Sequence, residues 1–586
     1  MTRGPAARMT AALAAAALAF AGCTTMPTES APQALRSYEE RSQNMEIPEP
    51  RPDTAPDVVL RDFIAAMAHP ADDYAAARAF LTGDIADTWN PRRRSLIVEG
   101  VNVISDAATP ADREVYTASG AVVGQLGDGG AYEQAEGTWR GEIAMVRDRS
   151  GQWRISQLPD GIVMERQSFV DTHVARNLYF VDPTGNHLVP DRRWIYRGTD
   201  DGAAALLDLL RRGPRPQLAR GVTSPLPAST AIEVGAVDAG PGTRIRYRGT
   251  GVAGADLELL LAAQTVWTLA DAGLRGPWAI EVDGRPVLDR AEVAWTRDSP
   301  ELKPFDPQRG PADRSALRVL GNGALYAIRE DGAEIAESPW GAGEPYLVSA
   351  AMGIDTTGEE IYAAVARGEG ATAKRSTLYL GRPGQPAARP LTGQTLTRPS
   401  WSPGAAAVWT VVDGEQVRRV GRFGESGALA AEQVDIRALK SFAGEISELR
   451  IDPMGTQAAM IIEGRLVLAT IVQNEGAPWA LVTPREIRLP EGTMPVSLAW
   501  APDSTILVGA WGAEAPIWRV QPDGSSNYML PKVNLTAPIA VVAASSTRIY
   551  ALDENALMEL IDDQGDQQFW RPVPKVSGRA APVTAE

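Results

Sequence analysis

The stretch Ser400-Trp401-Ser402-Pro403-Gly404 returns in altered form as Arg450-Ile451-Asp452-Pro453-Met454-Gly455 and as Ala499-Trp500-Ala501-Pro502-Asp503. Each copy joins the apolar end of one short run to a tight Pro or Gly turn and a second apolar run. A weaker copy is Gly353-Ile354-Asp355-Thr356. The matching positions 354, 401, 451 and 500 are 47, 50 and 49 residues apart, which is the period of β-propeller blades. The sequence therefore predicts a propeller and leaves its blade number open. Unrelated hairpins in a β-sandwich are the alternative.

The chain before the repeats mixes helices and strands. Val59 and Phe63 lie on one face of a first expected helix, which Thr54 can cap, and a second helix over 72–81 ends at Gly83. Extended runs follow at residues 95–104, 114–125, 132–146 and 152–157. Helices followed by an antiparallel sheet predict an α+β domain. It resembles the small cone-shaped domains of the nuclear-transport-factor-like (NTF2-like) type.

A second α+β unit precedes the repeats. It combines a strand over 177–181, a helix over 203–212, strands near 231–237 and 243–248, and a buried helix over 255–270. Its Leu178-Tyr179-Phe180, Ser224-Pro225-Leu226-Pro227 and Val282-Asp283-Gly284 segments resemble those of the GerMN domain, which occurs in spore-germination and other envelope lipoproteins.

The first residues have the features of an export signal. Arg3 and Arg8 precede the apolar run 11–21, which is too short to span a bilayer, and Gly22-Cys23 follows. A Cys at this place resembles a bacterial lipobox, in which it becomes the lipidated first residue of the mature chain; Phe20 departs from the usual Leu. A free buried thiol is the alternative reading of Cys23. The segment that follows is rich in Thr, Ser, Glu and Pro, as a tether is.

Composition restricts the chemistry. Lys+Arg 57 against Asp+Glu 73 gives a net charge of −16, which opposes a general nucleic-acid binder. The chain holds one Cys and three His (His69, His173 and His187), so intramolecular disulfides and Cys- or His-rich metal sites are excluded or nearly so. No GxSxG elbow surrounds any Ser, and we expect surface or capping histidines rather than a catalytic triad.

Three motifs suggest other chemistry on weak grounds. Gly249-Thr250-Gly251-Val252-Ala253-Gly254 fits a dinucleotide fingerprint, but the preceding strand 244–248 alternates polar and apolar residues, so a tight glycine turn is expected instead. Adjacent acidic pairs such as Asp72-Asp73, Glu359-Glu360 and Asp562-Asp563 could serve glycoside hydrolysis, yet neighbours on a strand face opposite sides. The run 562–566 could bind Ca²⁺, but its spacing fails the EF-hand loop.

Two features suggest contacts with partners. Arg92-Arg93-Arg94 could meet anionic lipid or an acidic partner, although a solvated surface is the commoner role of such a run. Among the tryptophans, Trp511 could anchor a partner if it is exposed on the rim of the propeller.

The order of lipobox, α+β domain, GerMN-like domain and propeller resembles the LpqB family of actinobacterial lipoproteins. The resemblance implies a non-enzymatic protein without cofactors or metal, lipidated at Cys23 by N-palmitoyl and S-diacylglycerol groups and anchored on the extracytoplasmic face of the cell membrane. It also implies binding to the extracytoplasmic domain of the sensor kinase MtrB, modulating two-component signalling in envelope homeostasis and cell division. A cell-wall glycan-binding or carbohydrate-acting lipoprotein is the alternative.

The expected organisation is a signal peptide 1–22, a lipidated tether 23–52, an N-terminal α+β domain 53–166, a GerMN-like domain 167–292, a β-propeller 300–573 and a tail 574–586.

Overall fold

The computed structural model describes residues 47–586 with short gaps. The gaps are 107–111, 199–201, 238–241, 290–293, 308–316, 330–331, 337, 340–344, 369–373, 424–427, 474–476, 513 and 562–568. Residues 48–586 form one compact unit. Within the described part of the chain, no helix is long and apolar enough to cross a membrane.

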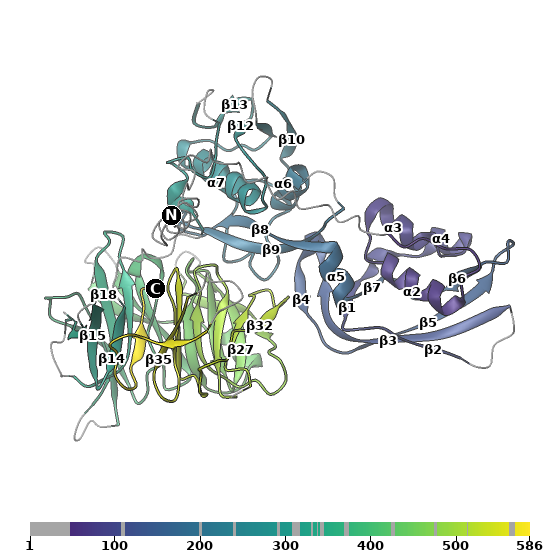
Figure 1. Ribbon diagram of the computed structural model, residues 1–586. Helices are drawn as coiled ribbons and strands as arrows, with labels where there is room; N and C mark the ends of the chain where they lie inside the picture. The colour runs from purple at the N-terminus through teal and green to yellow at the C-terminus, as the bar shows by residue number, and fades with distance from the viewer. Residues whose placement is uncertain are drawn as a thin grey trace, which may run out of the picture. The chain divides into compact units, whose positions relative to one another are not determined.

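The N-terminal part is a sheet with helices packed on it (Figure 1). Its elements are α2 (Pro56–Ala66), α3 (Ala71–Arg78), α4 (Gly83–Thr88), β1 (Ser95–Val98), β2 (Asn102–Ser105), β3 (Arg113–Leu126), β4 (Tyr132–Gln134), β5 (Thr138–Arg147), β6 (Trp153–Gln157) and β7 (Ile162–Glu165). The sheet order is β6-β5-β3-β1-β7, with β2 and β4 also pairing with β3. Val59 and Phe63 of α2 are buried in its core, as their spacing predicts.

Three local predictions in this part are wrong. Thr54 does not cap α2, because its hydroxyl donates to the Arg51 carbonyl (2.9 Å) and Ala55 is the N-cap residue. Gly83 begins α4 instead of ending the helix before it. The run 95–104 is two strands, and β7, which pairs parallel with β1, was not anticipated.

In the described residues, the second part packs three helices with two small sheets. Its elements are α5 (Arg166–Thr172), β8 (His173–Val181), β9 (Leu188–Tyr196), α6 (Gly202–Arg212), β10 (Ala231–Ala236), β11 (Thr243–Arg248), α7 (Ala255–Asp271), β12 (Trp278–Val282) and β13 (Arg285–Pro286). Leu206, Leu207 and Leu210 of α6 face the core, and α7 is largely buried, as predicted. The strand β9 was not predicted from the sequence.

The C-terminal part is built from antiparallel strands. They are β14 (Arg318–Gly321), β15 (Ala324–Arg329), β16 (Gly332–Ile335), β17 (Leu347–Ile354), β18 (Glu360–Arg367), β19 (Ser376–Gly381), β20 (Ala388–Gly393), β21 (Ser400–Trp401), β22 (Ala407–Val412), β23 (Gln416–Phe423), β24 (Ala428–Gln433), β25 (Ile446–Ile451), β26 (Gln457–Ile462), β27 (Arg465–Val472), β28 (Ala480–Ile487), β29 (Pro495–Trp500), β30 (Ile506–Ala510), β31 (Ile517–Val520), β32 (Asn527–Met529), β33 (Val541–Ala544), β34 (Arg548–Leu552), β35 (Leu557–Ile561), β36 (Arg571–Pro572) and β37 (Ala581–Val583).

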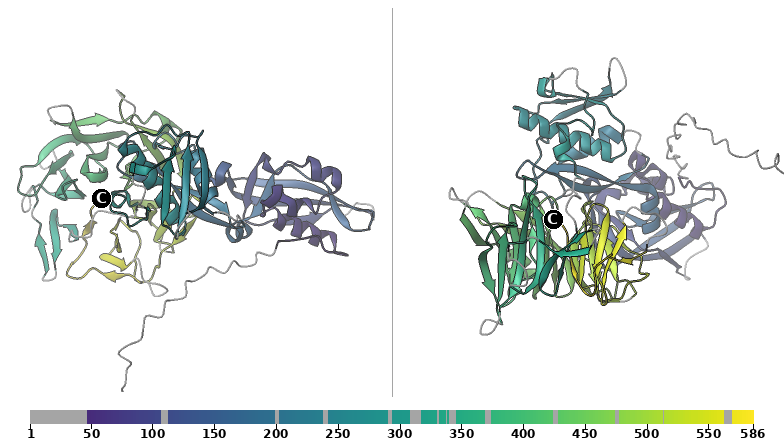
Figure 2. Two further views of the ribbon diagram at one scale, coloured as in Figure 1. Left: turned by 90° about the horizontal axis from the view of Figure 1, so that it is seen from above. Right: turned by 60° about the vertical axis from the view of Figure 1, so that its left-hand side comes forward.

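These strands form four-stranded sheets arranged as in a propeller. The described residues make six of them: β16-β15-β14-β37, β17 to β20, β21 to β24, β25 to β28, β29 to β32 and β33 to β36. The inner strands β17, β21, β25, β29, β33 and β37 contact one another in a closed ring, and Figure 2 shows the sheets around a common axis. The sandwich alternative is therefore wrong.

The first sheet closes the ring with a strand from the far end of the domain. Residues 574–586, expected as a tail, contain β37, which pairs antiparallel with β14 through Arg318 and Val583. Without this strand the first sheet would lack its inner strand. The backbone N–H and C=O groups of β14 on that edge would then have no hydrogen-bonded partner strand.

Candidate functional site

The repeated motif ends the inner strands of the propeller. Ile354, Trp401, Ile451 and Trp500 are the last residues of β17, β21, β25 and β29. The indole N–H of Trp401 donates to the carbonyl of Ala351 (3.4 Å), and that of Trp500 donates to the carbonyl of Arg450 (3.1 Å). In both cases the acceptor belongs to the preceding sheet, so the repeated tryptophan links each blade to its neighbour.

A cavity of about 70 Å³ lies where these inner strands meet. Its lining includes Pro403, Pro453 and Pro502, the turn prolines of the three clear motif copies, together with Arg398, Arg450 and Glu586. The motif copies therefore surround one axial cavity, and charged side chains enter it.

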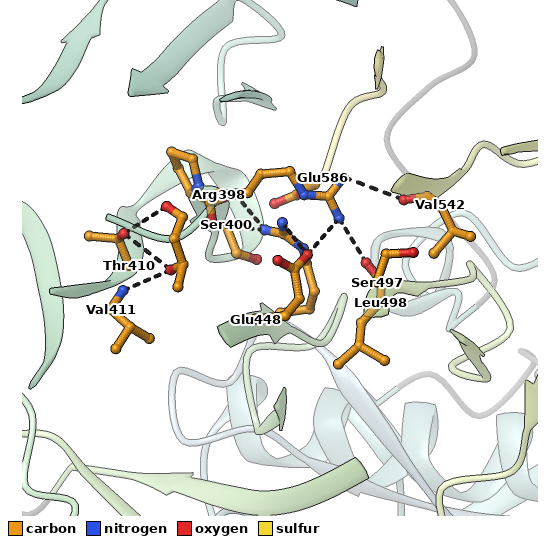
Figure 3. A network of polar contacts seen from close by, with 12 residues as sticks. Arg398, Ser400, Thr410, Val411, Glu448, Ser497, Leu498, Val542 and Glu586 are labelled. Atoms are coloured by element: carbon orange, nitrogen blue, oxygen red, sulfur yellow. Dashed lines mark hydrogen bonds and ion pairs between the residues drawn. The ribbon is translucent and has the colours of Figure 1, made fainter. Parts of the chain in front are cut away.

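The centre of this site is an ion-paired cluster of three residues (Figure 3). Glu448 and Arg450 stand two residues apart on β25, so they lie on the same face of the strand. Arg450, only 2% exposed at its side chain, donates from Nε (3.0 Å) and Nη2 (2.7 Å) to Glu448 Oε1. Arg398, just before β21, places its Nη2 3.1 Å from the same oxygen.

Both arginines also bind backbone carbonyls of neighbouring blades. Arg450 Nη1 donates to the carbonyl of Pro399 (2.6 Å), and Arg398 Nη2 donates to the carbonyl of Leu498 (2.7 Å). Arg398 Nη1 reaches the carbonyl of Val542 (3.4 Å). The cluster thus joins the inner strands of four consecutive sheets, which gives it a clear structural role.

Glu586 enters the cluster from the end of the closing strand. Its Oε2 accepts a hydrogen bond from the backbone N–H of Trp401 (2.7 Å), and its own N–H donates to the carbonyl of Met352 (2.9 Å). The hydroxyl of Ser400 is also hydrogen-bonded to the Glu586 carboxyl, whose charge Arg398 stabilises.

Burial dominates the electrostatics of the two carboxyl groups. Burial raises the pKa of Glu448 to about 7, which Arg398 opposes and the Glu586 charge reinforces. Burial likewise raises the pKa of Glu586, against Arg398 and the hydrogen bonds from Trp401 and Ser400. The cluster beside the cavity therefore concentrates two positive and two ionisable acidic groups in a small volume.

The lining offers hydrogen-bond donors for an anionic ligand. The hydroxyl of Ser400 accepts a hydrogen bond from the N–H of Ile451 (3.0 Å), and no histidine lines the described cavity to act as its base. The chemistry that this site offers is recognition of a carboxylate by a guanidinium, a hydroxyl and a backbone N–H.

The three histidines lie apart from this cavity. His69 is buried with its Nδ1 2.9 Å from the Tyr196 hydroxyl, and the His173 Nδ1 lies 2.9 Å from the Thr172 hydroxyl. His187 Nδ1 is 3.8 Å from Asp182. The expectation of surface or capping histidines is therefore wrong for His69 and His173, whose rings are packed against aromatic neighbours.

The glycine loop 249–254 has its donors occupied by the chain itself. The carboxylate of Asp283 accepts hydrogen bonds from the N–H groups of Gly249 (2.6 Å), Thr250 (3.3 Å) and Gly251 (3.3 Å). It also accepts from the Thr250 hydroxyl (2.6 Å). A protein carboxylate thus holds the place that a phosphate takes in a dinucleotide fold.

Members of the acidic pairs and of the arginine run 92–94 form ion pairs away from the axial cavity. Asp73 pairs with Arg78 (2.7 Å) and with Arg92 (2.9 Å), so the first basic residue of the run 92–94 has an acidic partner. Glu359 and Glu360 bind different arginines, Arg382 and Arg318. Cys23 and the acidic run 562–566 lie outside the described residues.

Trp511 is exposed, as an anchor must be. Trp511 is 61% exposed, and its backbone N–H donates to the backbone carbonyl of Met494 (2.9 Å), a residue that is 60% exposed. Met494 directly precedes β29, and Trp511 directly follows β30.

The axial cluster was not identified from the sequence. One available signal was the charged pair Glu448 and Arg450 in the run 446–451, spaced for one strand face. No sequence signal pairs Glu586 with Trp401, because that contact depends on closure of the ring.

Comparison with known proteins covers nearly the whole chain. Family models described as "Lipoprotein LpqB, N-terminal domain", "Sporulation and spore germination" and "Lipoprotein LpqB beta-propeller domain" match residues 49–170, 177–288 and 323–585.

Curated relatives match over a similar extent. The chain is 34% identical over 571 residues to lipoprotein LpqB of Corynebacterium jeikeium, covering 97% of this chain and 96% of that one. It is 36% identical over 554 residues to lipoprotein LpqB of Mycolicibacterium smegmatis, covering 92% of each. The Mycobacterium tuberculosis protein of that name is 34% identical over 580 residues, covering 96% of this chain and 97% of its own.

Proposed function

The chain belongs to the LpqB family of lipoproteins, and on this basis we propose that it is a non-enzymatic, membrane-anchored accessory of a sensor kinase. The observation that carries the proposal is the near full-length match at 34% identity to relatives named lipoproteins. Its partner is the extracytoplasmic domain of an MtrB-like kinase, and its role is to modulate two-component signalling in envelope homeostasis and cell division.

The anchor in this proposal is Cys23. The apolar run 11–21 and the small residue Gly22 precede it as in a lipobox. Buried acyl chains contribute about 0.8 kcal/mol for each CH₂ group, so the N-palmitoyl and S-diacylglycerol chains together hold the protein on the outer face of the cell membrane.

The N-terminal domain is the part whose fold type we infer by analogy. Its sheet packs against α2, α3 and α4, in keeping with a cone-shaped NTF2-like domain. The analogy concerns fold alone and assigns no ligand to it.

The partner is tested by crosslinking on cells. Anchored protein carrying an affinity tag is crosslinked and purified from membranes, and the kinase is detected by mass spectrometry. Recovery of the kinase from cells with the tagged protein, and not from untagged cells, is the expected result. Repeated absence of the kinase under conditions that crosslink other envelope proteins would contradict the proposal.

The alternative role in glycan binding is distinguished by a second measurement. Purified mature protein is incubated with cell-wall glycan, and binding and turnover are both measured. A kinase accessory shows neither, whereas a carbohydrate-acting lipoprotein shows at least one.

A further inference from the structure

The carboxylate of Glu586 accepts two hydrogen bonds and is stabilised by the charge of a guanidinium. It receives the backbone N–H of Trp401 (2.7 Å), the Ser400 hydroxyl and the charge of Arg398. A charged guanidinium, a hydroxyl and a backbone N–H are the groups with which proteins recognise carboxylates. The axial cavity therefore has the composition of a binding site, and one of its own residues fills it.

Ring closure does not require this side chain. The ladder between β37 and β14 ends at Val583, and Thr584 and Ala585 carry the backbone onward to the cavity. Three residue pairs close the first sheet without any part of Glu586. The glutamate side chain is therefore additional to the strand that completes the propeller.

Open volume and one unpaired hydrogen-bond donor of the described residues remain in the cavity beside Glu586. A volume of about 70 Å³ remains open, enough for small polar molecules. The Nε–H of Arg398 is buried and has no hydrogen-bond partner within the described residues. A buried donor without an acceptor costs about 1–3 kcal/mol, so an incoming acceptor would recover free energy.

The charge balance favours an anion once Glu586 leaves. Arg398 and Arg450 then face Glu448 as the remaining carboxylate of the cluster. The residue Glu586 is partly exposed although its carboxyl group is buried, and the turn prolines Pro403, Pro453 and Pro502 line the cavity around it.

We propose that the axial cavity of the propeller is a carboxylate-binding site, which Glu586 occupies from within the chain and for which an external carboxylate the length of a glutamate side chain competes. The site is independent of the kinase proposal. The tethered residue acts as a competitor at high effective concentration, so the apparent affinity for an external ligand is reduced by the fraction of time that the cavity is open.

The test compares the full chain with a variant that ends at Ala585 and is amidated there, so that no new α-carboxylate enters the cavity. Two probes are titrated by calorimetry: glutarate, and the acetylated and amidated peptide Pro-Val-Thr-Ala-Glu, whose only carboxylate is the side chain. The shortened variant is expected to bind one or both probes about tenfold or more tightly than the full chain. Glutarate alone would assign a small-molecule ligand, and the peptide alone an acidic segment.

Two controls make the result specific. The peptide with Gln in place of Glu should bind neither protein, and Arg398→Met in the shortened variant should abolish binding while circular dichroism stays unchanged. If the shortened variant does not fold, Glu586→Gln replaces it, because the amide oxygen can still accept from Trp401 while the charge is lost. Equal affinities in full and altered chains, or no binding by a folded altered chain, would overturn the proposal.

Discussion

At the scale of single residues, Glu448 is the carboxylate that compensates the buried charges of the axial cluster. Its Oε1 is the shared acceptor of two guanidinium groups, and all three side chains are largely buried. Removing one member of a buried ion pair leaves uncompensated charge and typically costs about 3–5 kcal/mol. We expect Glu448→Ala to lower the free energy of unfolding by about this amount in urea titrations.

The matched control for that substitution is an exposed pair. Arg437 pairs with Asp435 (2.6 Å) but is 82% exposed at its side chain, so Arg437→Ala should leave the urea midpoint nearly unchanged. Similar effects of the two substitutions would contradict the importance of the axial cluster.

The buried imidazole of His173 makes the free energy of unfolding depend on pH. Burial lowers the pKa of its imidazole to about 4, with small contributions from His69 and Arg197. Between about pH 6.5 and pH 4 the unfolded chain binds a proton that the folded chain does not, so the free energy of unfolding falls as the pH is lowered through this window.

We therefore expect His173→Phe to weaken the fall of Tm between about pH 7 and pH 4.5, measured by calorimetry. Phe can pack against Phe169, whose ring centroid is 5.1 Å from that of His173. Val170→Ala, at an exposed residue of α5 that does not titrate, is the control and should leave the slope unchanged. Identical slopes in wild type and His173→Phe would refute the assignment.

At the scale of elements, the repeated tryptophans connect blades. Trp500→Phe removes the hydrogen bond from its indole N–H to the Arg450 carbonyl, and we expect a loss of about 1–2 kcal/mol in unfolding free energy. Trp518 provides the control, because its indole N–H is buried with no hydrogen-bond partner in the described part of the chain. Trp518→Phe should cost less, and the reverse order would argue against the blade link.

Elements with a regular hydrophobic spacing could be predicted from the sequence, whereas a strand that buries an ion pair could not. The helices α6 and α7 and the four motif copies follow from hydrophobic spacing alone. The strand β9 contains Asp191-Arg192-Arg193, which reads as a loop. In the fold, the Arg193 guanidinium lies 2.8 Å from the Asp191 carboxylate, and this pairing allows both to be buried in a strand.

The candidate site could not be predicted from the sequence for a related reason. Glu448 and Arg450 are visible as a same-face pair in sequence, but Arg398 and Glu586 join them only through tertiary contacts. Local patterns report neighbours along the chain, whereas the cluster is set by the closed ring of inner strands.

At the scale of the whole molecule, the anchor and the partner surface are open to test. We expect Cys23→Ser to move the protein from the membrane fraction to the soluble fraction, because no acyl chain is then attached. Immunoblots of the two fractions measure the shift, with Ser42→Ala in the expected tether as a control that stays in the membrane. Membrane retention of the Cys23→Ser protein would contradict the lipid anchor.

The exposed Trp511 is the side chain that we expect to contribute most to kinase binding. Buried tryptophans at interfaces commonly contribute about 2 kcal/mol or more, so Trp511→Ser should weaken kinase crosslinking severalfold in quantitative mass spectrometry. Ile104, 64% exposed on β2, supplies the matched control, and Ile104→Ser should leave crosslinking unchanged. Equal crosslinking by both variants would exclude the Trp511 surface.

The closing strand also sets an order of events during biogenesis. Because β37 completes the sheet that β14 begins, the ring cannot close until nearly the whole propeller domain is available for folding. Until then β14 presents an unpaired edge that can join a strand of another chain. A stalled or clipped chain would therefore remain an aggregation-prone arc of blades.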